Sequence, residues 1–112
     1  MAVIYHLAPA ERWAAWPPGA PYLPAEFAGE GFIHCTVGDD LMLRIANRFY
    51  RNTAGDFVLL VLDSEKLTAP VRWERADVAE VEFPHIYGPV DQAAITEVRA
   101  VRRDADGTFV GW

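Results

Sequence analysis

The sequence predicts an α+β domain whose strands pair mainly antiparallel, and three observations support this class. Strand-like and helix-like segments alternate only in the first half of the 112 residues, and strand-like segments fill most of the second half. The unbroken apolar run "FVLLVLD" at residues 57–63 is typical of a central strand. Near the C-terminus, "RRDADG" separates two strand-like segments and indicates a hairpin.

The first elements are a strand, a helix and a loop. Residues 2–7, "AVIYHL", are rich in branched and aromatic side chains and predict a short buried strand. A proline in the first turn and two tryptophans three residues apart predict a helix over residues 9–16. The proline-rich "PPGAPYLP" that follows, at residues 17–24, predicts a structured surface loop.

A second strand is predicted at residues 31–36, "GFIHCT". Successive side chains of a strand point to opposite faces. This alternation places Phe32, His34 and Thr36 on one face and Ile33 and Cys35 on the other. Glu30 lies at even spacing from His34, so we expect it to orient His34 or to line the mouth of a cleft.

The pattern of residues 38–51 predicts the best-defined helix of the chain. At about 100° per residue its apolar positions share one face, namely Leu41, Met42, Ile45, Ala46 and Phe49. A stripe on the opposite side consists of Arg44, Arg48 and Arg51. Such a stripe is typical of a solvated helix face, and it is also a candidate phosphate site.

The second half of the chain contains mostly strand-like segments. After the strand at residues 57–63 we expect a short return segment at residues 67–73. Residues 81–90, "VEFPHIYGPV", predict a sharply bent, loop-rich segment between two prolines. Residues 94–101 and 108–112 flank the predicted hairpin turn.

Composition restricts the class of protein. The length predicts a single domain over residues 1–112. A net charge of −6 argues against non-specific binding of DNA or RNA. One cysteine permits no disulfide within the chain. No signal peptide is visible and no apolar run approaches the ~18 residues of a membrane span, so we expect a cytoplasmic protein without a membrane partner.

The three histidines are the main candidates for chemistry. His6, His34 and His85 each lie among apolar or aromatic neighbours. A buried imidazole is usually a satisfied core residue, but three of them also suit acid–base catalysis, metal binding or recognition of sugar hydroxyls. No histidine spacing typical of a metal site occurs, and we expect no metal. Cys35 is expected to be a small buried side chain rather than a nucleophile.

Six segments in order resemble one family: "IYHLAPAERW", "EGFIHCT", "ANRFY", "LLVLDSEKL", "VRWE" and "FPHIYGPV". They resemble the small bacterial proteins of unknown function called DUF952, over nearly the whole chain. That family remotely resembles the ADP-ribosyltransferase-like fold, whose members bind NAD in a cleft between sheets. The resemblance implies two small, mainly antiparallel sheets with two or three short helices, in a split-sheet arrangement.

The resemblance also implies functional residues. His6 matches the histidine that holds the nicotinamide ribose, and His34 matches a residue beside the nicotinamide. With His85 they are the candidate catalytic residues. Further candidate contacts to NAD or a related nucleotide are Thr36, which shares a strand face with His34, Tyr87, which is suited to stacking on a base, and Arg48 in the arginine stripe.

The reaction is left open by the sequence. Many relatives of that fold carry a catalytic glutamate on a later strand, and Glu74, Glu82 and Glu97 are the acids near the expected position. One hypothesis is ADP-ribosyl transfer or cleavage of NAD as a substrate. An alternative is a binding module for a nucleotide or small metabolite that carries out no reaction. Two weaker alternatives are a metal-dependent hydrolase that uses the three histidines and an RNA 2′-phosphate transferase.

Overall fold

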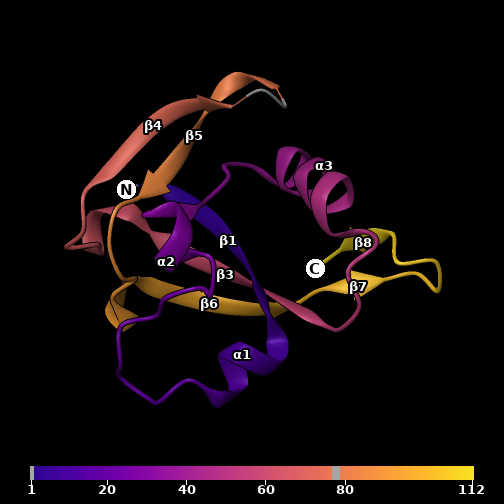
Figure 1. Cartoon of the computed structure of the whole chain (residues 1–112), viewed down its shortest axis with the longest axis horizontal. Coiled ribbons are helices and arrows are strands. Elements are labelled where there is room, and N and C mark those ends of the chain that lie inside the picture. Colours follow the sequence, from indigo (N-terminus) through magenta and orange to yellow (C-terminus); the bar gives the residue numbers. More distant parts are fainter. Residues whose placement is uncertain (1, 77–78) are drawn as a thin grey trace.

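The computed structural model describes residues 2–76 and 79–112 (Figure 1). The described strands are β1 (Val3–Pro9), β2 (Ile33–His34), β3 (Phe57–Asp63), β4 (Val71–Ala76), β5 (Ala79–Ile86), β6 (Ile95–Ala100), β7 (Arg102–Arg103) and β8 (Phe109–Gly111). The described helices are α1 (Ala10–Ala15), α2 (Phe27–Glu30) and α3 (Asp39–Tyr50), with short 3-10 helices η1 (Ser64–Lys66) and η2 (Gln92–Ala94).

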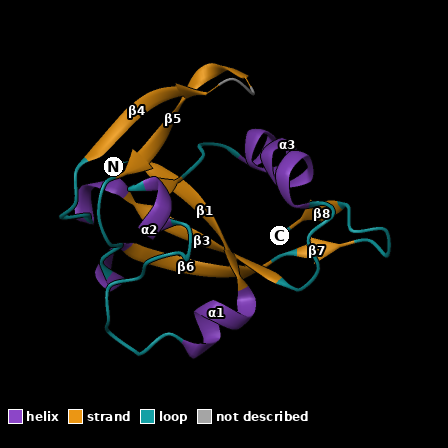
Figure 2. Cartoon of the chain, viewed as in Figure 1, coloured by secondary structure: helices purple, strands orange, loops and turns teal. Residues whose placement is uncertain are grey.

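The strands form small antiparallel sheets (Figure 2). One sheet has the order β1-β3-β6, a second has the order β2-β5-β4, and β7 pairs with β8. Every pairing between these strands is antiparallel. The helices and small antiparallel sheets confirm the predicted α+β class. No described helix is both long enough and apolar enough to cross a membrane.

The apolar run that predicted a central strand is β3, which lies between β1 and β6. Its side chains alternate between two cores, because successive residues of a strand point to opposite faces. Leu60 and Leu62 belong to a core that also contains Ile4 and Ile33. Leu59 belongs to a second core, which includes Met42 and Ala46 of α3 and Phe57 and Phe109. A strand buried on both faces therefore has no polar alternation.

A short segment after α2 joins the two larger sheets. β2 pairs with β5, with His34 opposite His85. The next pair in this register would be Cys35 and Pro84, where the Cys35 N–H donates to the Pro84 carbonyl at 3.1 Å. Proline has no N–H to return the second bond, so the ladder ends here. Thr36 then exchanges backbone hydrogen bonds of 2.8 and 2.9 Å with Tyr5 of β1.

This crossing segment determines where the histidines lie. Because the Cys35–Pro84 pair is of the hydrogen-bonded type, the neighbouring His34–His85 pair is of the non-hydrogen-bonded type, in which side chains lie closer together. The carbonyl of His34 then points away from β5 and toward β1, where it meets His6. Three residues that are distant in sequence are thus brought to the junction of the two sheets.

Several predicted boundaries differ from the structure. Residues 81–90 were expected to be a bent loop, but residues 79–86 form β5, which is paired on both sides. Pro84 is tolerated there because the ladder to β2 stops at its position. The predicted strand at 31–36 is reduced to β2 and the separate bridge at Thr36. The return segment expected at 67–73 starts later, as β4.

Two further differences concern the ends of the predicted elements. Helix α2 was not predicted, since its four residues are too few to show a helical period. The predicted C-terminal hairpin is divided in the structure: β6 joins β3 in the first sheet, and only the two-residue β7 pairs with β8. Helix α3 agrees with its predicted position, with Met42 and Ala46 buried and Arg44 and Arg48 exposed. Phe49, which was predicted on the same apolar face, is 53% exposed.

Candidate functional site

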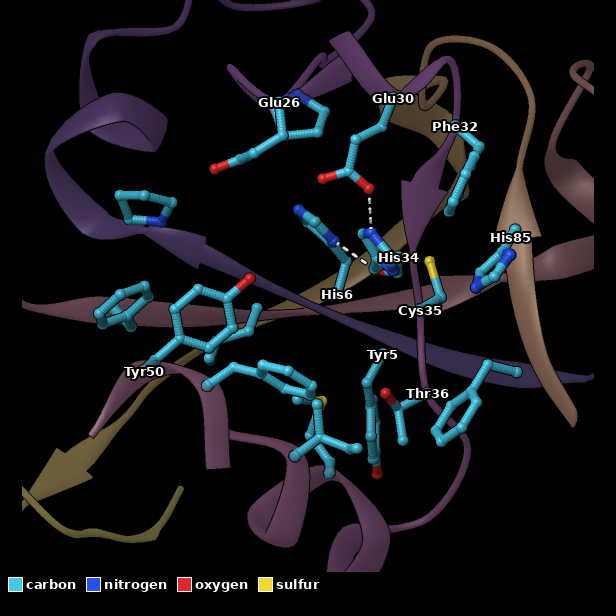
Figure 3. A pocket seen from close by; sticks show the side chains of 18 of the residues that line it. Tyr5, His6, Glu26, Glu30, Phe32, His34, Cys35, Thr36, Tyr50 and His85 are labelled. Carbon is cyan, nitrogen blue, oxygen red and sulfur yellow. Dashed lines mark hydrogen bonds and ion pairs between the residues drawn. The ribbon is translucent and has the colours of Figure 1, made fainter. Parts of the chain in front are cut away.

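A pocket of about 510 Å³ opens at the junction of the two sheets (Figure 3). Its lining residues come from β1, from the segment around α2, and from β2 with the residues after it. Others come from α3, from the start of β3 and from the end of β5. The volume lies within the roughly 300–1,000 Å³ typical of small-molecule sites. All three histidines line it, so the structure brings together His6, His34 and His85.

His6 lies on the floor of the pocket and is 7% exposed. Its Nδ1 lies 2.7 Å from the carbonyl oxygen of His34. A carbonyl only accepts hydrogen bonds, so Nδ1 carries the hydrogen and donates it. In the neutral ring the other nitrogen, Nε2, is then an acceptor. That atom is buried and has no hydrogen-bond partner among the described residues.

The buried position of His6 also keeps its ring neutral. Desolvation lowers the pKa of His6 below its ordinary value, while the hydrogen bond to the His34 carbonyl and the charge of Glu26 oppose this shift. Burial dominates because a protonated ring would place a second N–H on Nε2, for which the described part of the chain offers no acceptor. His6 therefore keeps a fixed lone pair on Nε2, a buried atom of a ring that lines the pocket.

His34 and two carboxylates form the rim. The His34 side chain is 56% exposed, and its Nε2 makes a short hydrogen bond with a carboxylate oxygen of Glu30. This contact confirms the expectation that Glu30 orients His34. Glu26 also lines the pocket, and within the described part of the chain its side chain makes no hydrogen bond or ion pair. In Figure 3 both glutamates lie on the same side of His6.

His85 forms another wall, held by a carboxylate behind it. Its ring stacks on Phe32 at a centroid distance of 4.3 Å and meets the edge of His34 at 5.3 Å. Its Nδ1 donates to Glu74 Oε1 at 2.8 Å, and the Tyr87 hydroxyl donates to the same oxygen at 2.5 Å. The hydrogen bond from Tyr87, and after it the one from His85, lowers the pKa of Glu74. The carboxylate in turn raises the pKa of Tyr87.

Of the three other residues that the sequence suggested for the site, one lines the pocket and two do not. Thr36 lines the pocket and is 4% exposed. Tyr87 is not among the lining residues; it lies behind Phe32, at 5.5 Å between ring centroids. Arg48 is not among them either, and its guanidinium lies 5.7 Å from the ring centroid of Phe49, which does line the pocket. Tyr87 is thus linked to His85 through Glu74 but does not line the pocket, and Arg48 does not line it either.

Cys35 lines the pocket but is 2% exposed. Burial alone raises the pKa of its thiol far above the ordinary value. A thiol that stays protonated at neutral pH is a poor nucleophile. Its position agrees with the expectation of a small buried side chain.

Of the two carboxylates that line the pocket, the sequence suggested Glu30 but not Glu26, and the three candidates for a catalytic glutamate lie elsewhere. Glu74 lies behind His85, Glu97 pairs with Arg99 on β6, and Glu82 is exposed on β5; none of them lines the pocket. Glu26 and Glu30 do, from the α2 segment. Glu30 was recognisable from its even spacing to His34, whereas Glu26 precedes an unpredicted four-residue helix and had no sequence signal. Among the described residues, no group of three or more His, Cys, Asp or Glu side chains is arranged to hold a metal ion.

The chain was compared with known families and structures. Residues 7–98 match the family described as protein of unknown function, DUF952. The crystal structure of protein CC0527 from Caulobacter crescentus is 27% identical, with a TM-score of 0.82 over 97% of this chain and 94% of that chain. The solution NMR structure of the same protein is 30% identical, with a TM-score of 0.73 over 96% and 90%. No curated protein matches. Because the family match covers most of its length, the chain belongs to the DUF952 family.

Proposed function

We propose that the pocket binds the nicotinamide-ribose end of NAD or of a related nucleotide. The observation that carries this proposal is the buried, unpartnered Nε2 of His6 in a pocket of small-molecule size. A buried acceptor without a partner costs free energy unless a ligand supplies a donor. A ribose hydroxyl is such a donor, and this role is the one that the resemblance to ADP-ribosyltransferase-like proteins implies for His6.

The walls of the pocket suit a flat heterocycle beside the ribose. Phe32 and His85 are stacked, and the ring of His34 lies at an edge to both. Aromatic rings favour offset or edge contacts with a further ring. Thr36 adds a hydroxyl at the pocket wall. These features support a nicotinamide position near His34 and a ribose position near His6.

The phosphates of such a ligand have a less obvious site. Neither lysine nor arginine occurs among the described residues that line the pocket. Arg48 is separated from it by Phe49, so it is the candidate for a phosphate at the outer edge. We therefore place the nucleoside end inside the pocket and the pyrophosphate outside it.

Cleavage of the bound nucleotide is the reaction that the pocket favours. The bond between ribose C1′ and the nicotinamide nitrogen would break with its electron pair passing to that nitrogen, which becomes neutral. The positive charge that develops on the ribose would be stabilised by a carboxylate at the rim, Glu26 or Glu30. Water or another acceptor would then bond to C1′ and lose a proton, with His34 or His85 as the candidate base.

A binding module that carries out no reaction is the second candidate. One observation favours it: none of Glu74, Glu82 and Glu97, the acids near the position of the catalytic glutamate in related folds, lines the pocket. Binding of NAD without release of nicotinamide over several hours would support the module. Release at a rate that depends on Glu26 or Glu30 would support the enzyme.

The experiment is a titration of the protein with NAD and with ADP-ribose, monitored by NMR of the histidine side chains. We expect the His6 signals to shift at millimolar ligand or below, and His6→Asn to weaken binding at least tenfold. Asparagine can keep the hydrogen bond to the His34 carbonyl but lacks the Nε2 acceptor. The matched control is Glu11→Gln, an exposed change on α1 outside the pocket. Unshifted histidine signals at millimolar NAD would refute the proposal.

A further inference from the structure

Apart from the histidines, the ionisable acidic and basic side chains that line the pocket are all acidic. Glu26 and Glu30 are the carboxylates, and no lysine or arginine accompanies them among the described lining residues. The buried His6 is neutral and offers no compensating charge. Glu30 is already hydrogen-bonded to His34, so Glu26 is the lining carboxylate without a side-chain partner among the described residues. A molecule at this site therefore meets carboxylates without a lysine or arginine beside them.

Aromatic rings reinforce this preference. Besides Phe32, the lining includes Tyr5, Phe49, Tyr50, Phe57 and Phe83. The face of an aromatic ring carries partial negative charge and attracts cations within about 6 Å. A group of rings combined with carboxylates is a favourable environment for an organic cation, and it is unfavourable for an anion.

The hydrogen bonding of His6 leads to the same conclusion independently. Its Nδ1–H already donates to the His34 carbonyl, so the unpartnered Nε2 can only accept. A fully ionised phosphate or a carboxylate has no hydrogen to give to it. A ligand can partner this atom only if it carries an O–H or N–H donor.

We propose that Glu26 and Glu30 form a cation subsite, and that the pocket selects an organic cation bearing an O–H or N–H donor for His6 Nε2. The identification of this cation as a pyridinium nucleoside rests on the proposed function; the selection by charge does not. The positive ring would lie toward the rim near the carboxylates, and the donor would reach down to His6. Glu26 is the cleaner probe of this subsite, because Glu30 also holds His34.

The test compares ligands that differ mainly in charge, by calorimetry or NMR titration. Nicotinamide riboside is a cation, its dihydro form is neutral and of similar shape, and nicotinamide mononucleotide adds a phosphate. We expect the cation to bind at least about tenfold tighter than the dihydro form, which is about the effect of two partly screened charges. Glu26→Gln should weaken binding of the cation about threefold or more and leave the neutral ligand unchanged. Glu11→Gln, the matched control, should change neither.

A third probe separates this inference from the proposed function. Choline is a cation with a hydroxyl but has no ribose and no pyridine ring. If choline binds in a Glu26-dependent manner while nicotinamide compounds do not bind, the cation subsite stands and the proposed function fails. If the cation and its dihydro form bind equally and depend on His6, the proposed function stands and the subsite is refuted. The subsite is also refuted if nicotinamide mononucleotide binds in the pocket more tightly than nicotinamide riboside, or if none of the cations binds.

Discussion

The neutral, buried state of His6 makes the stability of the protein depend on pH in a specific way. In the unfolded chain this residue titrates with its ordinary pKa of 6.5, whereas burial lowers the pKa of His6 in the folded protein. Between the two values the unfolded state binds more protons, so stability rises with pH there. The stability that neutral His6 contributes is fully present above pH 6.5 and is lost as pH falls toward the folded pKa.

The size of this pH dependence follows from the hydrogen bonding of the His6 ring. Nδ1 already donates to the His34 carbonyl at 2.7 Å, so the second proton must go to Nε2, a buried atom with no acceptor among the described residues. One proton bound only by the unfolded state changes the free energy of unfolding by up to about 1.4 kcal/mol per pH unit. Between pH 6.5 and 5.5, where titration of the unfolded histidine is only partly complete, we expect a loss of up to about 1 kcal/mol.

Urea denaturation of the wild type and of His6→Asn, measured from pH 5.0 to 7.5, isolates this contribution. Asparagine does not titrate, and the other histidines are present in both proteins, so their effects cancel in the difference. The wild type should lose stability relative to the variant as the pH falls below 6.5. The smaller asparagine adds a difference that is constant with pH. Parallel stability curves for the two proteins across this range would refute the assignment of a buried, neutral His6.

Three other predictions follow from particular contacts. Glu74→Gln replaces the carboxylate whose hydrogen bond and charge raise the pKa of Tyr87, so the phenol should ionise at lower pH, as measured by ultraviolet absorbance; an unchanged midpoint would contradict the contact. Gly88→Ala should destabilise the protein by about 1–3 kcal/mol, because the added Cβ would lie 2.7 Å from a neighbouring alanine Cβ. The matched control, Gly29→Ala, meets no atom within 4 Å and should not destabilise it; thermal or urea unfolding compares the two, and equal effects would count against the argument. The thiol of Cys35 should react with a thiol reagent only as fast as the protein opens, since it is 2% exposed and burial raises its pKa; fast labelling of the folded protein would show that it is accessible.

Local patterns predicted the elements that have strong periodicity. The run at residues 57–63 is β3, and the helix predicted at residues 38–51 is α3, with Met42 and Ala46 of its apolar face buried and Phe49 exposed. Prediction was weaker where tertiary contacts override local signals. Pro84 suggested a loop, but it lies in β5 at the position where the ladder to β2 ends, so its missing N–H disrupts no further pairing. The four residues of α2 are too few for any pattern to identify.

The residues of the candidate site were likewise only partly predictable from the sequence. The sequence singled out His6, His34 and His85, and it paired Glu30 with His34 by spacing along the chain. It did not find Glu26 in the pocket, because that residue has no periodic relation to the histidines. It also grouped Tyr87 and Arg48 with the site, although Tyr87 bonds to Glu74 behind His85 and Arg48 lies beyond Phe49. Position in the sequence does not show whether a side chain faces the pocket or lies on the far side of the residues that line it.

The sequence by itself determined the α+β class, the central strand and the unusual placement of three histidines among apolar residues. These are local properties, set by side-chain period, branching and burial preference. Only the tertiary structure decided that the three rings line one pocket. The physical reason lies in residues 33–36, which pair first with β5 and then with β1. That crossing turns the carbonyl of His34 toward His6, and Nε2 of His6 is left as a buried acceptor without a partner in the part of the chain that the structure describes.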